Sequence, residues 1–129
     1  MGLKYAAFFI LDKNDKTLIL RYKYGNNKGL YSGPGGHLEN SDKNSKEGAI
    51  RELYEETSID YHKLNIIKEK SWTYNKTTKI FSILVEKIPK IKLSDEHDSY
   101  KIIEVCNLVN YNLTKPYLTS LIKNYSLIK

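Results

Sequence analysis

The chain has 129 residues, of which 40% are hydrophobic and 28% are charged. This is an ordinary globular composition that suits one domain with a buried core. No apolar run reaches the roughly 18 residues that a membrane-spanning helix needs, so we expect no membrane partner. The formal net charge of +6 favours an anionic ligand and allows, without requiring, nucleic acid.

The first third of the chain is predicted to consist of strands joined by short polar segments. Apolar, β-prone runs alternate there with clusters of Asp, Asn, Lys and Gly, which are typical of turns. Strands are predicted at residues 4–11, 17–24 and 30–32, separated by a hairpin turn at 12–16 and a polar loop at 25–29. The last of these strands leads into the glycine cluster at 33–36.

A helix is predicted at residues 45–57. Asn44 is a good N-cap, and Glu47 three residues later forms a pair that resembles a capping box. Strands are then predicted at residues 66–74, 79–88 and 100–104, with a loop at 89–99 before the last strand, and a terminal helix is predicted at 115–127. The chain therefore reads as one mixed α/β domain, residues 1–129, with mostly hairpin-linked strands.

Three glutamates share one face of the central helix. At about 100° per residue, Glu52, Glu55 and Glu56 fall within roughly 100° of arc, whereas Ile50 and Leu53 fall on a face suited to packing on a sheet. A solvated acidic face is the alternative. Like charges at these spacings repel, however, and the helix dipole disfavours them in the last turn. A hard divalent cation would turn repelling carboxylates into ligands.

The glycine cluster provides a second candidate element. Gly33, Gly35 and Gly36 are expected to let the backbone take positive φ angles and approach a ligand closely. Backbone carbonyls of this loop could join the same metal site, and backbone N–H groups could meet phosphate oxygens. The alternative is an ordinary tight turn.

Residues 36–39 (GHLE) and 51–59 (RELYEETSI) together resemble the Nudix box. The family pattern is Gly, five residues, Glu, seven residues, and then Arg-Glu-apolar-any-Glu-Glu-any-Gly-apolar. Ser58 stands where the family has Gly. The stretch from Gly36 to Arg51 is one residue longer than the pattern. We align Asp42 with the first Glu and place the extra residue at 43–45.

The resemblance implies a Nudix-type α/β/α sandwich with a mixed β-sheet. It implies hydrolysis of a phosphoanhydride bond in a nucleoside diphosphate derivative, with one to three Mg²⁺ or Mn²⁺ ions neutralising the pyrophosphate and acidifying the attacking water. The expected metal ligands are Glu52, Glu55, Glu56 and the Gly36 carbonyl. Arg51 would orient Glu55.

The same resemblance suggests which group takes the proton from water. Glu55 or Glu56 would act as the base. Residues 94–103 are similar to the acidic loop and strand that follow the sheet in many Nudix enzymes, which makes Glu96 the other candidate. A polar loop with solvated charges is the alternative reading of this segment.

The substrate is expected to be a small nucleotide, such as a nucleoside triphosphate, a dinucleoside polyphosphate or a nucleotide sugar. An enzyme that removes mRNA caps and a non-catalytic nucleotide-binding module remain alternatives. Gly35 and His37 are candidate substrate contacts. Aromatic candidates for stacking on the base are Tyr5, Phe9, Tyr31, Trp72 and Tyr74, of which Tyr31 and Tyr74 are preferred.

Compartment and assembly are constrained only weakly. Cys106 is the single cysteine, so an internal disulfide is excluded, and a reducing, cytoplasmic compartment is expected. The start of the chain lacks the apolar core of a secretion signal. Both a monomer and a homodimer remain open.

Overall fold

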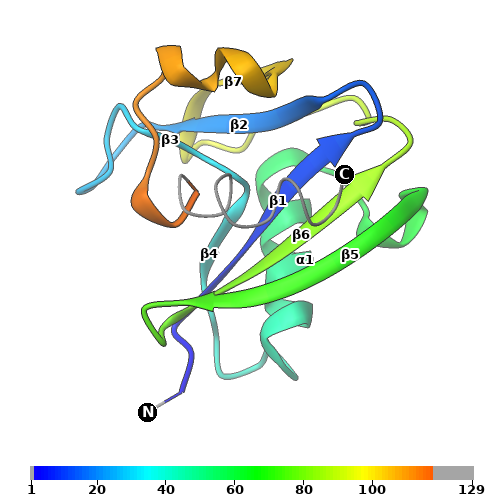
Figure 1. Ribbon diagram of the computed structural model, residues 1–129. Helices are drawn as coiled ribbons and strands as arrows, with labels where there is room; N and C mark the ends of the chain where they lie inside the picture. The colour runs from blue at the N-terminus through cyan, green and yellow to red at the C-terminus, as the bar shows by residue number, and fades with distance from the viewer. Residues whose placement is uncertain (1, 118–129) are drawn as a thin grey trace.

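A computed structural model describes residues 2–117 of the chain (Figure 1). Its seven strands form one sheet, with a 13-residue helix, α1 (Ser45–Thr57), packed against it. The strands are β1 (Tyr5–Asp12), β2 (Lys16–Tyr22), β3 (Tyr31–Ser32), β4 (Gly35–His37), β5 (Ile66–Tyr74), β6 (Thr78–Val85) and β7 (His97–Glu104). Two 3-10 helices are η1 (Tyr61–Lys63) and η2 (Val105–Asn110). None of the helices in the described part is long and apolar enough to cross a membrane.

The sheet is mixed, as the resemblance to the Nudix family implied. Its main path runs β3-β2-β1-β6-β5, with β4 paired to β1 and β7 paired to β2. β1 and β6 are parallel, and the other pairings between these seven strands are antiparallel. β1 meets β2 near its end, at Leu11 and Thr17, and meets β4 near its start, from Tyr5 to Ala7. The two neighbours therefore share one side of β1, and β4 occupies the part that β2 leaves open.

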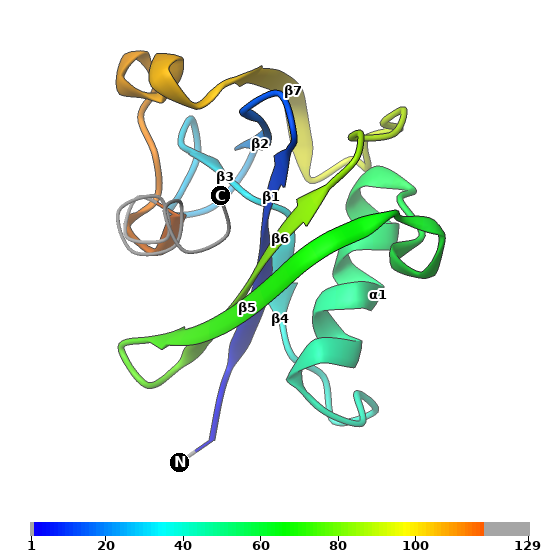
Figure 2. The same ribbon diagram turned by 45° about the vertical axis from the view of Figure 1, so that its right-hand side comes forward.

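The two faces of the sheet carry separate apolar clusters. Phe8 and Ile10 of β1 point toward α1, where they pack with Leu53. Phe9 and Leu11 alternate to the opposite face, because successive side chains of a strand point to opposite sides. There the cluster includes Leu108 of η2 and Tyr117. Figure 2 shows α1 on one side of the sheet and the segment around η2 on the other.

The helix begins and ends where the sequence predicted. The Asn44 side chain accepts a hydrogen bond from the Glu47 backbone N–H at 2.9 Å, which caps the first turn. Ser58 adopts the left-handed conformation, with φ of 63°, and its N–H donates to the carbonyl of Tyr54. A serine thus fills the position for which helix ends favour glycine.

Two predicted boundaries near the end of the chain differ from the structure. β6 ends at Val85 instead of residue 88, and β7 begins at His97, three residues before its predicted start. The early start of β7 has a tertiary cause, because its first residue, His97, pairs with Tyr22 of β2. Residues 115–117 are helical, and the rest of the predicted terminal helix lies outside the described residues.

The two faces of α1 predict different costs of truncation. Leu53 is fully buried against the sheet, whereas Tyr54 beside it is 58% exposed. We expect Leu53→Ala to lower the free energy of unfolding by about 2–5 kcal/mol, because it removes buried surface and leaves a cavity. Tyr54→Ala, the matched control, should change it by less than about 0.5 kcal/mol. Urea denaturation measures both, and equal losses would contradict this packing.

Candidate active site

Three carboxylates converge beside the C-terminal half of α1. Glu52 and Glu56 come from the helix, and Glu96 comes from the loop just before β7. One oxygen of each lies within 4.8 Å of one oxygen of the others. Glu52 and Glu56 are buried, and Glu96 is exposed. Glu55, which the sequence grouped with the helix pair, is outside this cluster and lies at its rim.

The chain segment before β7 is docked on the last turn of α1. The N–H of Lys92 donates to the carbonyl of Thr57 at 2.9 Å, and the N–H of Ser94 donates to that of Glu56 at 3.1 Å. These bonds satisfy two of the carbonyls that a helix end leaves without partners. They also bring Glu96 back to the helix from far along the chain.

Burial makes the cluster electrostatically costly without a cation. Desolvation, with smaller contributions from Glu52 and Glu96, raises the pKa of Glu56 to about 9. A hydrogen bond from the Gly35 N–H at 2.9 Å offsets only part of this. Burial likewise raises the pKa of Glu52. Closely spaced carboxylate oxygens that are hard to ionise together suit a hard divalent cation, which prefers such donors.

The glycines next to the cluster serve close approach, and the expectation of positive φ at Gly33, Gly35 and Gly36 is wrong. The described glycines with positive φ are Gly25 and Gly29. Gly35 and Gly36 belong to β4, whose pairing with β1 keeps them extended. A Cβ atom on Gly36 would lie 2.6 Å from Cδ of Glu52, and one on Gly35 would lie 2.3 Å from Cβ of Ala7. Only glycine lets β4 pass between β1 and the helix carboxylates.

Arg51 ties the acidic groups together. Its Nη1 donates to Glu52 Oε2 at 3.2 Å and to Glu55 Oε1 at 3.1 Å. Its Nη2 donates to the carbonyl of His37 at 3.1 Å. The guanidinium thus contacts Glu55, Glu52 and the end of β4, and its role in orienting Glu55 stays a prediction.

Asp42 completes this network from the loop before the helix. Its two oxygens accept from Nε and Nη2 of Arg51 at 2.9 and 3.0 Å, and Oδ2 also accepts from the Glu39 N–H at 2.8 Å. The Arg51 side chain lowers the pKa of Asp42, so the carboxylate stays charged. Although the loop has one extra residue, the Asp42 side chain therefore points toward Arg51 and not into the solvent. Glu47 is exposed.

The carboxylates open into an acidic cavity of about 520 Å³. Residues of β1, β2, β4 and α1 and of the loops next to them line it, and Glu55, His37 and Tyr24 stand at its exposed parts. A second, more apolar cavity of about 530 Å³ adjoins it, with Tyr74, Leu30 and Leu113 among its walls. The two share Tyr5, Tyr22, Asn27, Gly35 and Gly36. An acidic compartment thus borders an apolar one.

The predicted substrate contacts differ in which of the two cavities they border. Gly35 borders both cavities, His37 borders the acidic one with its ring 4.5 Å from that of Tyr5, and Tyr74 borders the apolar one. Tyr31 borders neither, because its ring packs edge-on against Tyr111. Two of the other aromatic candidates, Phe9 and Trp72, belong to the cluster on the η2 side of the sheet.

Sequence reasoning missed Tyr22, Tyr24 and Asn27, which line the acidic cavity. They follow one another around the end of β2 and the loop after it. Nothing in their local sequence distinguishes them from an ordinary strand end, because the wall that they form depends on β4 and α1. Burial and the neighbouring carboxylates raise the pKa of Tyr22, so its phenol is neutral.

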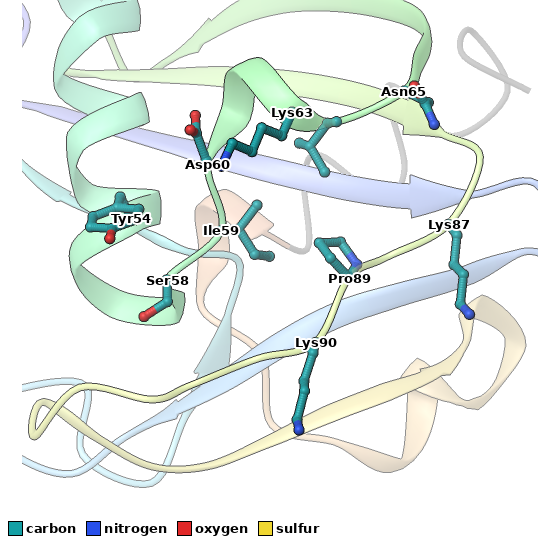
Figure 3. Close-up of a pocket in the computed structure, with 10 residues that line it drawn as sticks. Tyr54, Ser58, Ile59, Asp60, Lys63, Asn65, Lys87, Pro89 and Lys90 are labelled. Carbon is teal, nitrogen blue, oxygen red and sulfur yellow. The ribbon is translucent and has the colours of Figure 1, made fainter.

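A further cavity of about 530 Å³ lies beyond the C-terminal end of α1 (Figure 3). Lysines 63, 87 and 90 and Asp60 surround a floor that includes Ile59 and Pro89. Lys87 and Lys90 extend away from Lys63 in this view, so the ammonium groups do not converge on one point. None of the clustered carboxylates lines this cavity, and we do not place the chemistry there.

Comparison with known proteins gives one family. The model described as NUDIX domain matches residues 3–121. An Ap4A hydrolase from C. elegans has a similar structure, with a TM-score of 0.74 and 24% identity over 96% of each chain. So does a bifunctional NMN adenylyltransferase/ADP ribose pyrophosphatase from Francisella tularensis, complexed with AMP and a Mn ion. Its TM-score is 0.78 at 22% identity, over 100% of this chain and 42% of that one.

A MutT protein from Methanosarcina mazei Go1 is also similar, with a TM-score of 0.64 and 23% identity over 98% of this chain and 94% of that one. At these identities the structural likeness shows the fold alone. No curated protein sequence matches the chain.

The raised pKa of Glu56 predicts how stability depends on pH without metal. Between its ordinary value of 4.5 and about 9, the folded protein holds a proton that the unfolded chain has released. The free energy of unfolding should therefore fall as pH rises through this range. Thermal unfolding in EDTA from pH 5.5 to 9 measures the slope. Glu56→Gln cannot titrate and should flatten it, and an unchanged slope in this variant would contradict the assignment.

The contact between Asp42 and Arg51 predicts that Asp42→Asn weakens cation binding. Losses of about 10- to 100-fold in affinity are typical when a group that orients metal ligands is removed. Glu47→Gln, the matched control in the first turn of α1, should bind as wild type, because Asn44 caps that turn through the Glu47 backbone N–H. Calorimetric titration with Mn²⁺ compares them. A loss in Glu47→Gln alone would mean that the loop is aligned wrongly.

Proposed function

Because the chain belongs to the NUDIX-domain family and is a Nudix pyrophosphohydrolase, we propose a substrate and a cofactor for it. The substrate is a small nucleoside diphosphate derivative, which the protein hydrolyses with Mg²⁺ or Mn²⁺. The observation that carries the proposal is the group formed by Glu52, Glu56 and Glu96. These carboxylates would hold the cation together with the Gly36 carbonyl. The fit rests on their spacing and on the raised pKa of Glu56, which a bound cation would lower.

A divalent cation bound there would neutralise the pyrophosphate and make the attacking water more acidic. The protein's own groups would contribute by holding the carboxylates in position around the cation. The Gly35 N–H holds Glu56 in place, and Arg51 holds Glu52 and Glu55 against the end of β4. The proton of the water would pass to a carboxylate that borders the cavity and solvent. Glu96 and Glu55 both meet this requirement, whereas Glu56 is buried.

The nucleoside would occupy the apolar cavity next to the carboxylates. Aromatic walls suit the flat face of a base, and Tyr5, Tyr22 and Tyr74 border this space. Because Tyr5 and Tyr22 also border the acidic cavity, one molecule can place its base in one compartment and its phosphates in the other. This arrangement supports a small nucleotide, since a cavity of about 530 Å³ is in the size range of sites that hold small molecules.

The relatives narrow the first substrates to be tried. Ap4A and ADP ribose are named for proteins with a similar structure. A binding module without catalysis is disfavoured by the carboxylate cluster, because a protein that only binds a nucleotide has no need for Glu52, Glu56 and Glu96 to converge.

Substrate screening tests the proposal. We expect purified protein to hydrolyse at least one member of a panel of nucleoside triphosphates, dinucleoside polyphosphates, nucleotide sugars, ADP ribose and capped RNA. Released phosphate is measured after a coupled phosphatase, with Mg²⁺, with Mn²⁺ and in EDTA. Turnover that persists in EDTA would contradict metal dependence. Tight nucleotide binding with no turnover of any member would favour the binding module.

Substitution of Glu56 tests whether the acidic face of α1 takes part in catalysis. Glu56→Gln keeps the size of the side chain and can still accept the hydrogen bond from the Gly35 N–H. We expect kcat to fall by about 10²-fold or more, because a major electrostatic group is lost. The fold should survive, since glutamine, unlike Glu56, carries no group whose ionisation is costly at this buried position. Wild-type turnover by a folded variant would refute the role of this cluster.

A further inference from the structure

Glu96 reaches the carboxylate cluster next to an irregularity in the pairing of β2 with β7. Arg21 pairs with Ser99, but Tyr22 pairs with His97, so Asp98 has no partner in the register. One extra residue in a strand is a β-bulge, which bends the strand and redirects the side chains beside it. The bulge lies two residues after Glu96, at the point where β7 leaves the loop docked on α1.

The bulged residue is clamped by an arginine of the neighbouring strand. Nε and Nη2 of Arg21 donate to Oδ1 and Oδ2 of Asp98 at 2.7 and 2.8 Å. A bidentate pair of this kind restricts orientation as well as distance. Two further contacts fix the residues before Asp98 against the neighbouring strand. The Tyr22 and His97 rings lie 4.9 Å apart, and the Lys23 N–H donates to the Glu96 carbonyl at 3.0 Å.

The last two residues of β2 and Lys23 just after it thus hold three consecutive residues that begin with Glu96. Tyr22 at the centre also borders the acidic cavity, so the clamp is continuous with the wall of the site. A salt bridge at this degree of exposure contributes little to stability. Its bidentate geometry instead suits a role in fixing the direction in which the chain runs at the bulge.

We propose that the Arg21–Asp98 pair is a positioning device, which sets the β7 bulge so that Glu96 points at Glu52 and Glu56. Neither residue touches the substrate or the cation in this scheme, and both act through Glu96. The inference rests on the proposed function, because it assumes that the three glutamates form the metal site.

Mn²⁺ affinity of the full chain, measured by calorimetry, gives a readout apart from activity. Arg21→Met and Asp98→Asn should each weaken Mn²⁺ binding by about 10-fold, which is the lower end of the effect seen for groups that orient metal ligands. Arg21→Lys keeps the charge but not the fork and should fall between them and wild type. Lys13→Met is the matched control, because it removes another exposed ion pair, Lys13–Glu86 at 2.9 Å, away from the cluster.

The thermal midpoints of Arg21→Met and Lys13→Met should shift equally, whereas only Arg21→Met should lose Mn²⁺ affinity. Equal Mn²⁺ affinity in the two variants would overturn the proposal. Should Arg21→Met fail to fold, Asp98→Asn decides alone, since it keeps the shape of the side chain. Wild-type Mn²⁺ affinity in a folded Asp98→Asn would overturn the proposal in the same way.

A double-mutant cycle with Glu96→Gln tests the route of the effect. If Arg21 acts through Glu96, adding Arg21→Met to Glu96→Gln should cause no further loss of Mn²⁺ affinity or kcat. A full additional 10-fold loss would show that Arg21 acts elsewhere and would overturn the proposal. Failure of the wild-type protein to bind Mn²⁺ or to hydrolyse any nucleotide would instead refute the proposed function, so the two failures are distinguishable.

Discussion

The burial of two glutamates one helical turn apart is the constraint around which the site is organised. Glu52 and Glu56 are removed from water on the same face of α1, where burial raises the pKa of both and Glu52 further disfavours the charge of Glu56. Desolvation and like charge act in the same direction, and both raise a carboxyl pKa. A fold keeps such a pair only if nearby donors or cations offset the cost of burying the two carboxyl groups. Most of the structure around Glu52 and Glu56 supplies such groups.

Part of the compensation comes from the protein itself. The Gly35 N–H donates to Glu56, and Arg51 donates to Glu52. Both donors depend on β4, because this strand carries Gly35 and ends at His37, whose carbonyl binds Arg51. β4 can lie there only because a glycine leaves room for Glu52. The glycines, the arginine and the acidic pair therefore form one unit, and the remaining negative charge is what a divalent cation would neutralise.

The position of β4 also explains why two unlike cavities meet. Because β2 pairs with β1 only near the end of that strand, the start of β1 faces β4, and Tyr5 and Tyr22 become walls of both cavities. The acidic side is built by a helix and a docked loop, and the apolar side by strands and the segment around Leu113. In the proposed function, the aromatic end of a nucleotide would lie on the apolar side, and its phosphates would meet the carboxylates through a bound divalent cation.

The sequence by itself determined α1, its cap at Asn44 and the placement of Glu52 and Glu56 on one face, because these depend on helical periodicity and on neighbours a few residues away. Apolar runs bounded by turn residues also determined most of the strands, whereas the mixed sheet followed only from the resemblance to the Nudix family. Tertiary structure decided what was not local. It brought Glu96 into the cluster, left Glu55 at the rim, gave Gly35 and Gly36 extended conformations, and made walls of Tyr22 and Tyr24. Each of these outcomes depends on strand pairing or docking between segments distant in the chain. The sequence next to each residue does not specify such contacts.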